Sequence, residues 1–165
     1  MKVLLVDLRN PLSSSAVEVM SFANDNDAPV VLVVGHGDST GDSVDGFTAD
    51  TFPSFPSARV IWFYACNCGK SLVTKIARRG VTAFGYVTGI LAPALEELSL
   101  ANCIRDALED YTGDLSPMTV LCHVQDRLLK EAGRLLEQRR IEQNAIQLLR
   151  AALINHTRLS LRFAS

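Results

Sequence analysis

The stretch that decides the fold is Arg59-Val-Ile-Trp-Phe-Tyr-Ala-Cys-Asn-Cys-Gly-Lys-Ser71. Its first half is rich in aromatic and β-branched residues, which predicts a buried strand over Arg59–Ala65. After Cys66 the apolar residues recur at helical spacing, which predicts a helix over Gly69–Arg79 that Gly80 ends. A strand that leads directly into a helix is the basic unit of an α/β fold.

A second apolar run, Val30–Val34, is followed by Gly-His-Gly, and it is apolar at every position, as in a strand that is covered on both faces. Strands alternating with helices predict an α/β three-layer sandwich with a mainly parallel central sheet and additional C-terminal helices. The other expected strands are Lys2–Leu8, Val81–Val87 and an edge strand over Arg158–Phe163, and the other expected helices cover about 13–23, 47–55, 93–111 and most of the tail.

Length and charge restrict the classes of protein to consider. The 165 residues suit a single domain, with an α/β core over 1–112 and a mainly helical extension over 117–165. The net charge of −2 argues against a general nucleic-acid binder. Residues 1–116 have a net charge of −6, and residues 117–165 have a net charge of +4. The basic tail is therefore expected to pack on the acidic body or to bind an acidic partner.

The sequence predicts a cytoplasmic protein. Met1–Asp7 is too short for the apolar region of a secretory signal, and no apolar run approaches the ~20 residues that span a bilayer. The four cysteines, 66, 68, 103 and 122, therefore read as thiols and not as a disulfide framework.

The candidate chemistry lies where the two central strands end. Parallel strands bring their carboxyl ends to one edge of the sheet, so His36 and Cys66 are expected to meet there. A thiol beside an imidazole can attack a carbonyl carbon, and the Gly37 N–H is available to a developing oxyanion. We favour Cys66 over Cys68 because Cys66 ends the strand. The structural alternative is a packing cysteine and an isolated histidine.

Three other sites are weaker alternatives. Gly69-Lys70-Ser71 matches the end of a phosphate-binding loop, but the full pattern requires glycine where Tyr64 stands. Zinc could use Cys66, Cys68 and a histidine, although Cys-x-Cys is not the usual spacing. Asp38, Asp42 and Asp45 could hold calcium, but they do not match an EF-hand loop, and a solvated loop is the simpler interpretation.

The motifs resemble those of caspase-like cysteine peptidases, in particular the bacterial CHAT domain. The segments concerned are Val33-Val-Gly-His-Gly37, Ala65-Cys-Asn-Cys-Gly69 and Gly80-Val-Thr-Ala-Phe-Gly-Tyr-Val87. The resemblance implies a caspase-like fold and an endopeptidase in which Cys66 attacks, His36 transfers the proton, and the Gly37 and Cys66 N–H groups bind the oxyanion. We expect Asp38, Tyr64 and Tyr86 to bind substrate, and no cofactor or metal.

The resemblance to this family does not determine which residue precedes the bond that is cleaved. Family members that cleave after Arg or Lys often carry an acidic residue shortly before the cysteine, and this chain has Phe63, Tyr64 and Ala65 there. The expected partner is a protein or peptide substrate, with homo-oligomer or regulatory-protein contacts through the C-terminal helices, and neither nucleic acid nor membrane. The alternative is an inactive caspase-like scaffold that binds partners through its basic helical tail.

Overall fold

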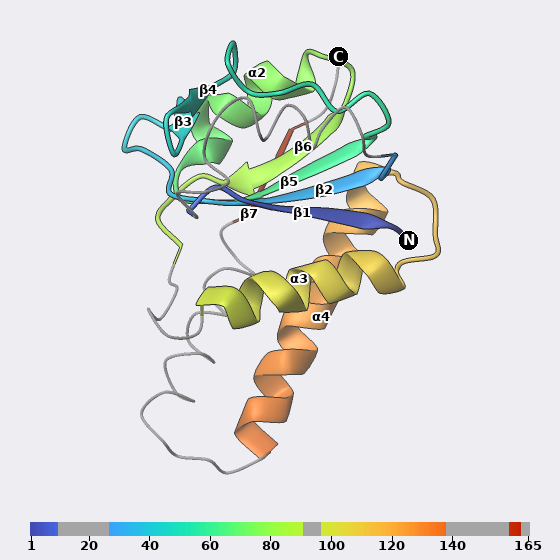
Figure 1. The fold of residues 1–165 in the computed structure, drawn as a ribbon. Helices are drawn as coiled ribbons and strands as arrows, with labels where there is room; N and C mark the ends of the chain where they lie inside the picture. Colours follow the sequence, from blue (N-terminus) through green and yellow to red (C-terminus); the bar gives the residue numbers. More distant parts are fainter. Residues whose placement is uncertain (10–26, 91–96, 138–158, 163–165) are drawn as a thin grey trace.

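The computed structural model describes residues 1–9, 27–90, 97–137 and 159–162. The expected helix over 13–23 and the tail beyond residue 137, apart from the last strand, lie outside these ranges. The described part is an α/β structure in which one sheet is covered by helices on both faces (Figure 1).

The central sheet contains four parallel strands and one antiparallel edge strand. Its order is β1-β2-β5-β6-β7, with bounds Val3–Asp7, Val30–Val34, Val60–Tyr64, Thr82–Tyr86 and Leu159–Arg162. β1, β2, β5 and β6 pair in parallel, and β7 runs antiparallel to β6. The expected α/β class, mainly parallel sheet and C-terminal edge strand are therefore confirmed.

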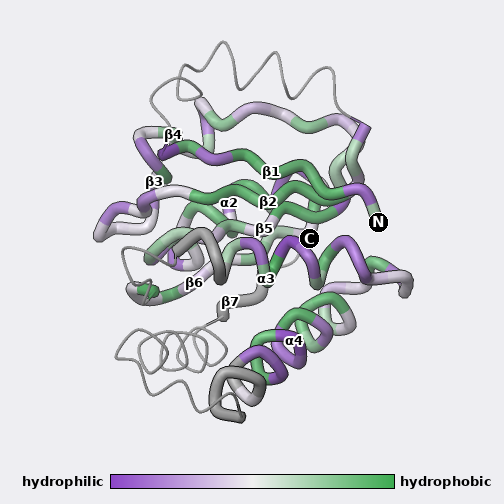
Figure 2. Tube along the Cα trace, turned by 60° about the horizontal axis from the view of Figure 1, so that its bottom comes forward, coloured by the Kyte–Doolittle hydropathy of each residue, from purple (hydrophilic) through white to green (hydrophobic). Residues whose placement is uncertain are grey.

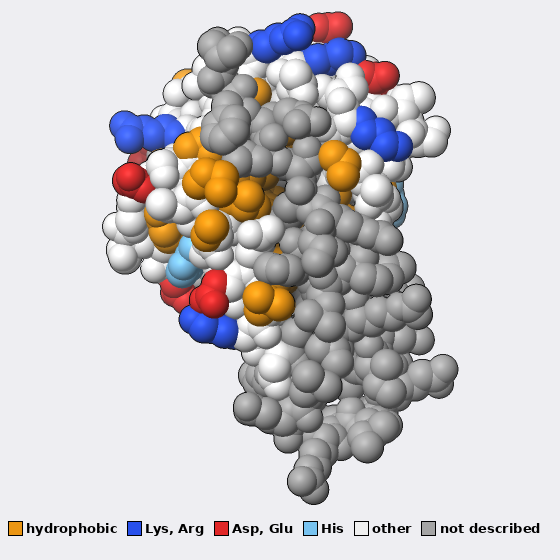
Figure 3. Space-filling view, turned by 180° about the vertical axis from the view of Figure 1, so that it is seen from behind, with side chains coloured by type: hydrophobic (Ala, Val, Ile, Leu, Met, Phe, Trp, Pro, Cys, Tyr) orange, Lys and Arg blue, Asp and Glu red, His pale blue; other side chains and the backbone are white. Residues whose placement is uncertain are grey.

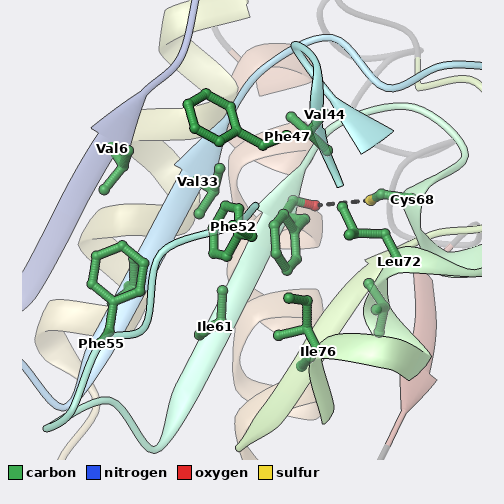
Figure 4. Close-up of a cluster of buried hydrophobic side chains, with 14 of the residues drawn as sticks. Val6, Val33, Val44, Phe47, Phe52, Phe55, Ile61, Cys68, Leu72 and Ile76 are labelled. Atoms are coloured by element: carbon green, nitrogen blue, oxygen red, sulfur yellow. Dashed lines mark hydrogen bonds between the residues drawn. The ribbon is translucent and has the colours of Figure 1, made fainter. Parts of the chain in front are cut away.

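Alternate residues of each strand fill two separate cores, because successive side chains point to opposite faces. In β5, Ile61 and Phe63 join one core, whereas Trp62 and Tyr64 join the other. Figure 4 shows the first core, where the Phe52 and Phe63 rings lie 5.2 Å apart between centroids. In the second core Trp62 stacks on Phe84 with ring centroids 4.7 Å apart.

Helices α3 (Glu97–Asp110) and α4 (Pro117–Glu137) cover the face that carries Trp62 (Figures 1 and 2). Their buried positions recur at helical spacing and include Ile104, Leu108, Val120, Val124 and Leu128. α3 confirms the helix expected over about 93–111, and α4 confirms the first part of the helical extension expected over 117–165. Within the described ranges, no helix is both long and apolar enough to cross a membrane.

The opposite face is covered by α2 (Leu72–Ala77) and by a small hairpin, β3 (Ser43–Val44) and β4 (Phe47–Thr48). The expected helix over Phe47–Phe55 is wrong. Asp45 and Gly46 both have positive φ, at 45° and 82°, as the central residues of a type I′ turn do, and this turn makes residues 43–48 a hairpin. Phe47, Phe52 and Phe55 instead pack into the core.

The helix expected over Gly69–Arg79 is shorter in the structure. Asn67 has a left-handed backbone (φ 58°), and a single 3-10 turn, η1 (Cys68–Lys70), follows it before α2 begins. This sharp turn directly after β5 leaves Cys66 at the carboxyl edge of the sheet, between the strand and the first helical turn.

Candidate active site

Cys66 is held in a tight turn at the end of β5. Its carbonyl accepts the Cys68 N–H at 2.7 Å, and the Asn67 N–H binds the Thr88 carbonyl at 3.1 Å. The Cys66 side chain is partly exposed, and its sulfur accepts the Ile90 N–H at 3.4 Å. The thiol is therefore attached to the loop that carries Ile90 and is still accessible to a substrate.

His36 follows β2 at the same edge and is attached to Asp45. The two Asp45 carboxylate oxygens accept the His36 backbone N–H at 2.8 Å and contact its ring Nδ1 at 3.1 Å. In return the Asp45 N–H binds the His36 carbonyl at 2.8 Å. The imidazole is exposed, and its Nδ1 is already engaged, so Nε2 is the nitrogen that can reach a substrate or a thiol.

The two segments are in direct contact through Gly37. A Cβ atom added there would lie 1.7 Å from the Cys66 carbonyl oxygen, so only glycine allows this approach. The Asn67 side-chain amide also donates to the Asp38 carbonyl at 3.2 Å. The structure therefore brings the His36 and Cys66 segments together, as the sequence predicts.

Further along, the loop after Asp38 is bound to the start of α2. The Leu72 N–H binds the Gly41 carbonyl at 2.8 Å, and Asp42 accepts hydrogen bonds from Ser71 and Lys75. The Lys75 contact is the main cause that lowers the pKa of Asp42. These bonds fix the His36 loop against the helix that follows Cys66.

Two amides at this edge are candidates for an oxyanion site. Gly37 and Val44 form an isolated antiparallel bridge, and its two bonds run from the Asp45 N–H to His36 and from the Asp38 N–H to Ser43. This pattern leaves the Gly37 N–H outside the ladder. Among the described residues, neither the Gly37 N–H nor the Cys66 N–H donates a hydrogen bond.

The His36 imidazole and the Cys66 thiol are hydrogen-bonded to other groups. Among the hydrogen bonds of the described residues, none joins His36 to the Cys66 sulfur, which is bonded to Ile90 instead. Catalytic hydrogen bonds are often long in unliganded enzymes and tighten when substrate binds. His36 and Cys66 thus lie on two loops that meet at one edge of the sheet, without a hydrogen bond between their side chains.

Cys68 is not equivalent to Cys66. It is fully buried, and its thiol donates to the Ala65 carbonyl at 3.1 Å. Burial raises the pKa of Cys68 to about 12, so this thiol stays protonated at neutral pH. The preference for Cys66 as the reactive cysteine agrees with this placement.

Asp38, which we expected to bind substrate, organises the loop that follows His36. Its carboxylate accepts the hydroxyls of Ser43 at 2.6 Å and Thr40 at 2.7 Å, and the backbone N–H groups of Gly41 and Asp42. These donors, Ser43 first, hold the pKa of Asp38 well below its ordinary value. The carboxylate thus holds the loop together, and both of its oxygens already accept hydrogen bonds.

Tyr64 and Tyr86 are also not where a substrate could meet them. Tyr64 is 1% exposed and Tyr86 is 0% exposed, and both lie in the core beneath α3 and α4. Their rings pack edge to face with centroids 5.9 Å apart. The structure therefore does not bring these rings to the edge that carries His36 and Cys66, because their strand positions direct both rings into the core beneath α3 and α4.

The alternative sites find no support among the described residues. No group of three or more His, Cys, Asp or Glu side chains there could hold a metal ion. Lys70 donates to the Ser39 carbonyl at 3.3 Å, and Ser71 donates to Asp42. Both residues of the phosphate-loop motif thus serve to attach the 38–42 loop.

The sequence interpretation missed the role of Asp45 beside His36 and the contribution of the Ile90 amide. Asp45 belongs to an Asp-Gly pair flanked by strand-forming residues, which is a strong hairpin signal, and this signal would have predicted its turn. The Ile90 amide has no sequence signal, because a backbone donor depends only on where the loop passes. Comparison with protein-family models, curated proteins and solved structures finds no match for this chain.

Proposed function

We propose that the protein is a cysteine endopeptidase of the caspase-like type, with Cys66 as nucleophile and His36 as general acid and base. The observation that supports it most is the direct packing of Gly37 on the Cys66 peptide, beside a partly exposed thiol and two free amides. A parallel sheet in the order 1-2-5-6 with helices on both faces is compatible with a caspase-like three-layer sandwich.

The proposed acylation step begins with transfer of the Cys66 proton to His36 Nε2. The thiolate attacks the scissile carbonyl carbon, and the carbonyl π electrons move to its oxygen, which the Gly37 and Cys66 N–H groups stabilise. The tetrahedral intermediate then collapses. The C–N bond breaks, and the amine leaves with the proton that the imidazolium returns to its nitrogen.

Hydrolysis of the resulting thioester uses the same groups. His36 Nε2 takes a proton from water as the oxygen attacks the acyl carbon. The C–S bond breaks, the imidazolium protonates the sulfur, and the carboxylic acid product is released. The Nδ1 bond to Asp45 is kept throughout, and the contact between Nε2 and the sulfur forms when the substrate is bound.

A second candidate is an inactive scaffold that binds other proteins. Among the described residues no hydrogen bond joins the His36 imidazole to the Cys66 thiol, which favours this function. Two large apolar side chains are also exposed on α4, Met118 at 54% and Leu129 at 42%. Figure 3 shows hydrophobic side chains gathered on one face of the molecule, with charged side chains around them. A second copy of the chain or a regulatory protein would bind such a surface.

Cleavage of a diverse peptide library distinguishes the two functions. The peptidase predicts cleavage by the wild type, loss of cleavage in Cys66→Ala and His36→Ala, and retention in Cys68→Ala with its buried thiol. Cleavage that survives Cys66→Ala but not Cys68→Ala would overturn the assignment. If the folded wild type cleaves no peptide, with or without added cell extract, the scaffold becomes the better account.

A further inference from the structure

Asp45 is bonded to His36 in a way that selects one form of the imidazole. A carboxylate only accepts hydrogen bonds, so the 3.1 Å contact between Oδ1 and Nδ1 requires a proton on Nδ1. The second oxygen accepts the His36 backbone N–H at 2.8 Å, which fixes the carboxylate relative to the ring. The type I′ turn fixes the Asp45 backbone in turn.

From this geometry we infer that Asp45 is a positioning residue, which keeps the His36 proton on Nδ1 and leaves Nε2 as the proton acceptor for Cys66. The inference rests on the proposed function for its catalytic meaning. The tautomer itself is a property of the free protein and can be measured whether or not the protein cleaves peptides.

Other charged groups near His36 are committed elsewhere. Asp7, at the end of the neighbouring strand β1, is paired with Arg9 through two bonds of 2.9 and 2.8 Å. The hydrogen bond from Arg9 is the largest cause that lowers the pKa of Asp7, and the electrostatic effect of His36 on that pKa is the smallest of the causes. The carboxylates of Asp38 and Asp42 are bound within the loop and to α2. Among the described residues, Asp45 is therefore the carboxylate that binds the ring.

The Asp45→Asn variant isolates this role. Asparagine tolerates positive φ and precedes Gly46, so an Asn-Gly pair keeps the type I′ turn. Asparagine has only one side-chain oxygen, and this oxygen keeps the hydrogen bond from the rigid His36 backbone N–H. The amide NH₂ then faces Nδ1 and can only donate, so the imidazole proton must move to Nε2.

The test is long-range ¹H–¹⁵N NMR of the imidazole, with the His36 signals identified by their loss in His36→Gln. We expect the neutral ring to carry its proton on Nδ1 in the wild type and on Nε2 in Asp45→Asn. Asp50→Asn, at an exposed position of the same segment, is the control and should leave the tautomer unchanged. A wild-type proton on Nε2, or an unchanged tautomer in Asp45→Asn, would overturn the inference.

Peptide cleavage provides the second readout. An aspartate-to-asparagine change that imposes the wrong tautomer lowers kcat by roughly 10⁴-fold in a serine peptidase, so we expect a fall of at least roughly 10²-fold here, with KM unchanged. A tautomer change without a fall in kcat would leave Asp45 a structural residue only. Failure of the proposed function looks different, since the wild type would then show the Nδ1 proton and no cleavage.

Discussion

Replacing Gly37 by alanine is the sharpest structural test of the two-loop site. The added Cβ would lie 1.7 Å from the Cys66 carbonyl oxygen and 2.8 Å from its carbonyl carbon, whereas ordinary contacts begin at 3.4 Å. These are backbone atoms, so no side-chain rotation relieves the clash. Gly37 is not among the glycines with positive φ, so the clash is the only penalty that alanine introduces.

The magnitude follows from how far the loops must separate. To relieve the clash, the distance between the added Cβ and the Cys66 carbonyl oxygen must increase from 1.7 Å to at least 3.4 Å. Misplacement of a catalytic group by about 1 Å is enough to lower a rate by about 10²-fold, so we expect at least that loss in kcat/KM. Overpacking of this kind also lowers the free energy of unfolding by about 1–3 kcal/mol.

The assay compares Gly37→Ala with Gly89→Ala, using urea denaturation and peptide cleavage. Gly89 lies on the loop beside Cys66, and a Cβ there meets no atom within 4 Å. Gly89→Ala should therefore keep wild-type stability and activity. The reasoning would be refuted if Gly37→Ala behaved like Gly89→Ala in both measurements.

Three further predictions follow from the burial and hydrogen bonds of the site. Iodoacetamide should label Cys66 in the native protein and Cys68 only after unfolding, because burial raises the pKa of Cys68 to about 12. Peptide mapping by mass spectrometry identifies the labelled cysteine, and labelling of Cys68 in the native protein would contradict the prediction. The pKa of Asp38 is lower in the folded protein than its unfolded value of about 3.9, so its contribution to stability is present above that value and is lost as pH falls through the folded pKa. Asp38→Asn should therefore lower the urea midpoint at pH 7 and make the midpoint depend less on pH in acid, and wild-type and variant midpoints that fall in parallel with pH would argue against this. Tyr86→Phe removes one oxygen from a fully buried ring in the core beneath α3 and α4, so peptide cleavage should be unchanged and the free energy of unfolding should change by less than about 1 kcal/mol. Loss of cleavage without loss of stability would show that Tyr86 belongs to the site.

The strands were the most predictable part of the fold. Val30–Val34 is found with the expected bounds, and β5 and β6 are each one residue shorter at both ends than expected. Continuous apolar runs identify strands that are covered on both faces. The same property hides which face each residue occupies, which is why Tyr64 and Tyr86 were expected at the site and lie in the core.

The loops were less predictable, because their structure depends on turn geometry and on contacts distant in sequence. The apolar residues after Gly46 suggested a helix, although the Asp45-Gly46 pair specifies a hairpin. Acidic residues in a polar loop give no sign of their partners. Asp38, Asp42 and Asp45 look alike in the sequence, yet they bind the loop itself, α2 and His36 respectively.

The central claim, that Cys66 and His36 act as a reacting pair, is tested most directly by the rate at which Cys66 is alkylated at neutral pH. The alkylating agent is a peptide-based one, which supplies the substrate contacts that bring the pair together, so the rate is informative even if the conditions for peptide cleavage are unknown. Wild type and His36→Ala are compared, with His123→Ala on α4 as the control. The account predicts that only His36→Ala slows the alkylation of Cys66. Equal rates in all three proteins would contradict it.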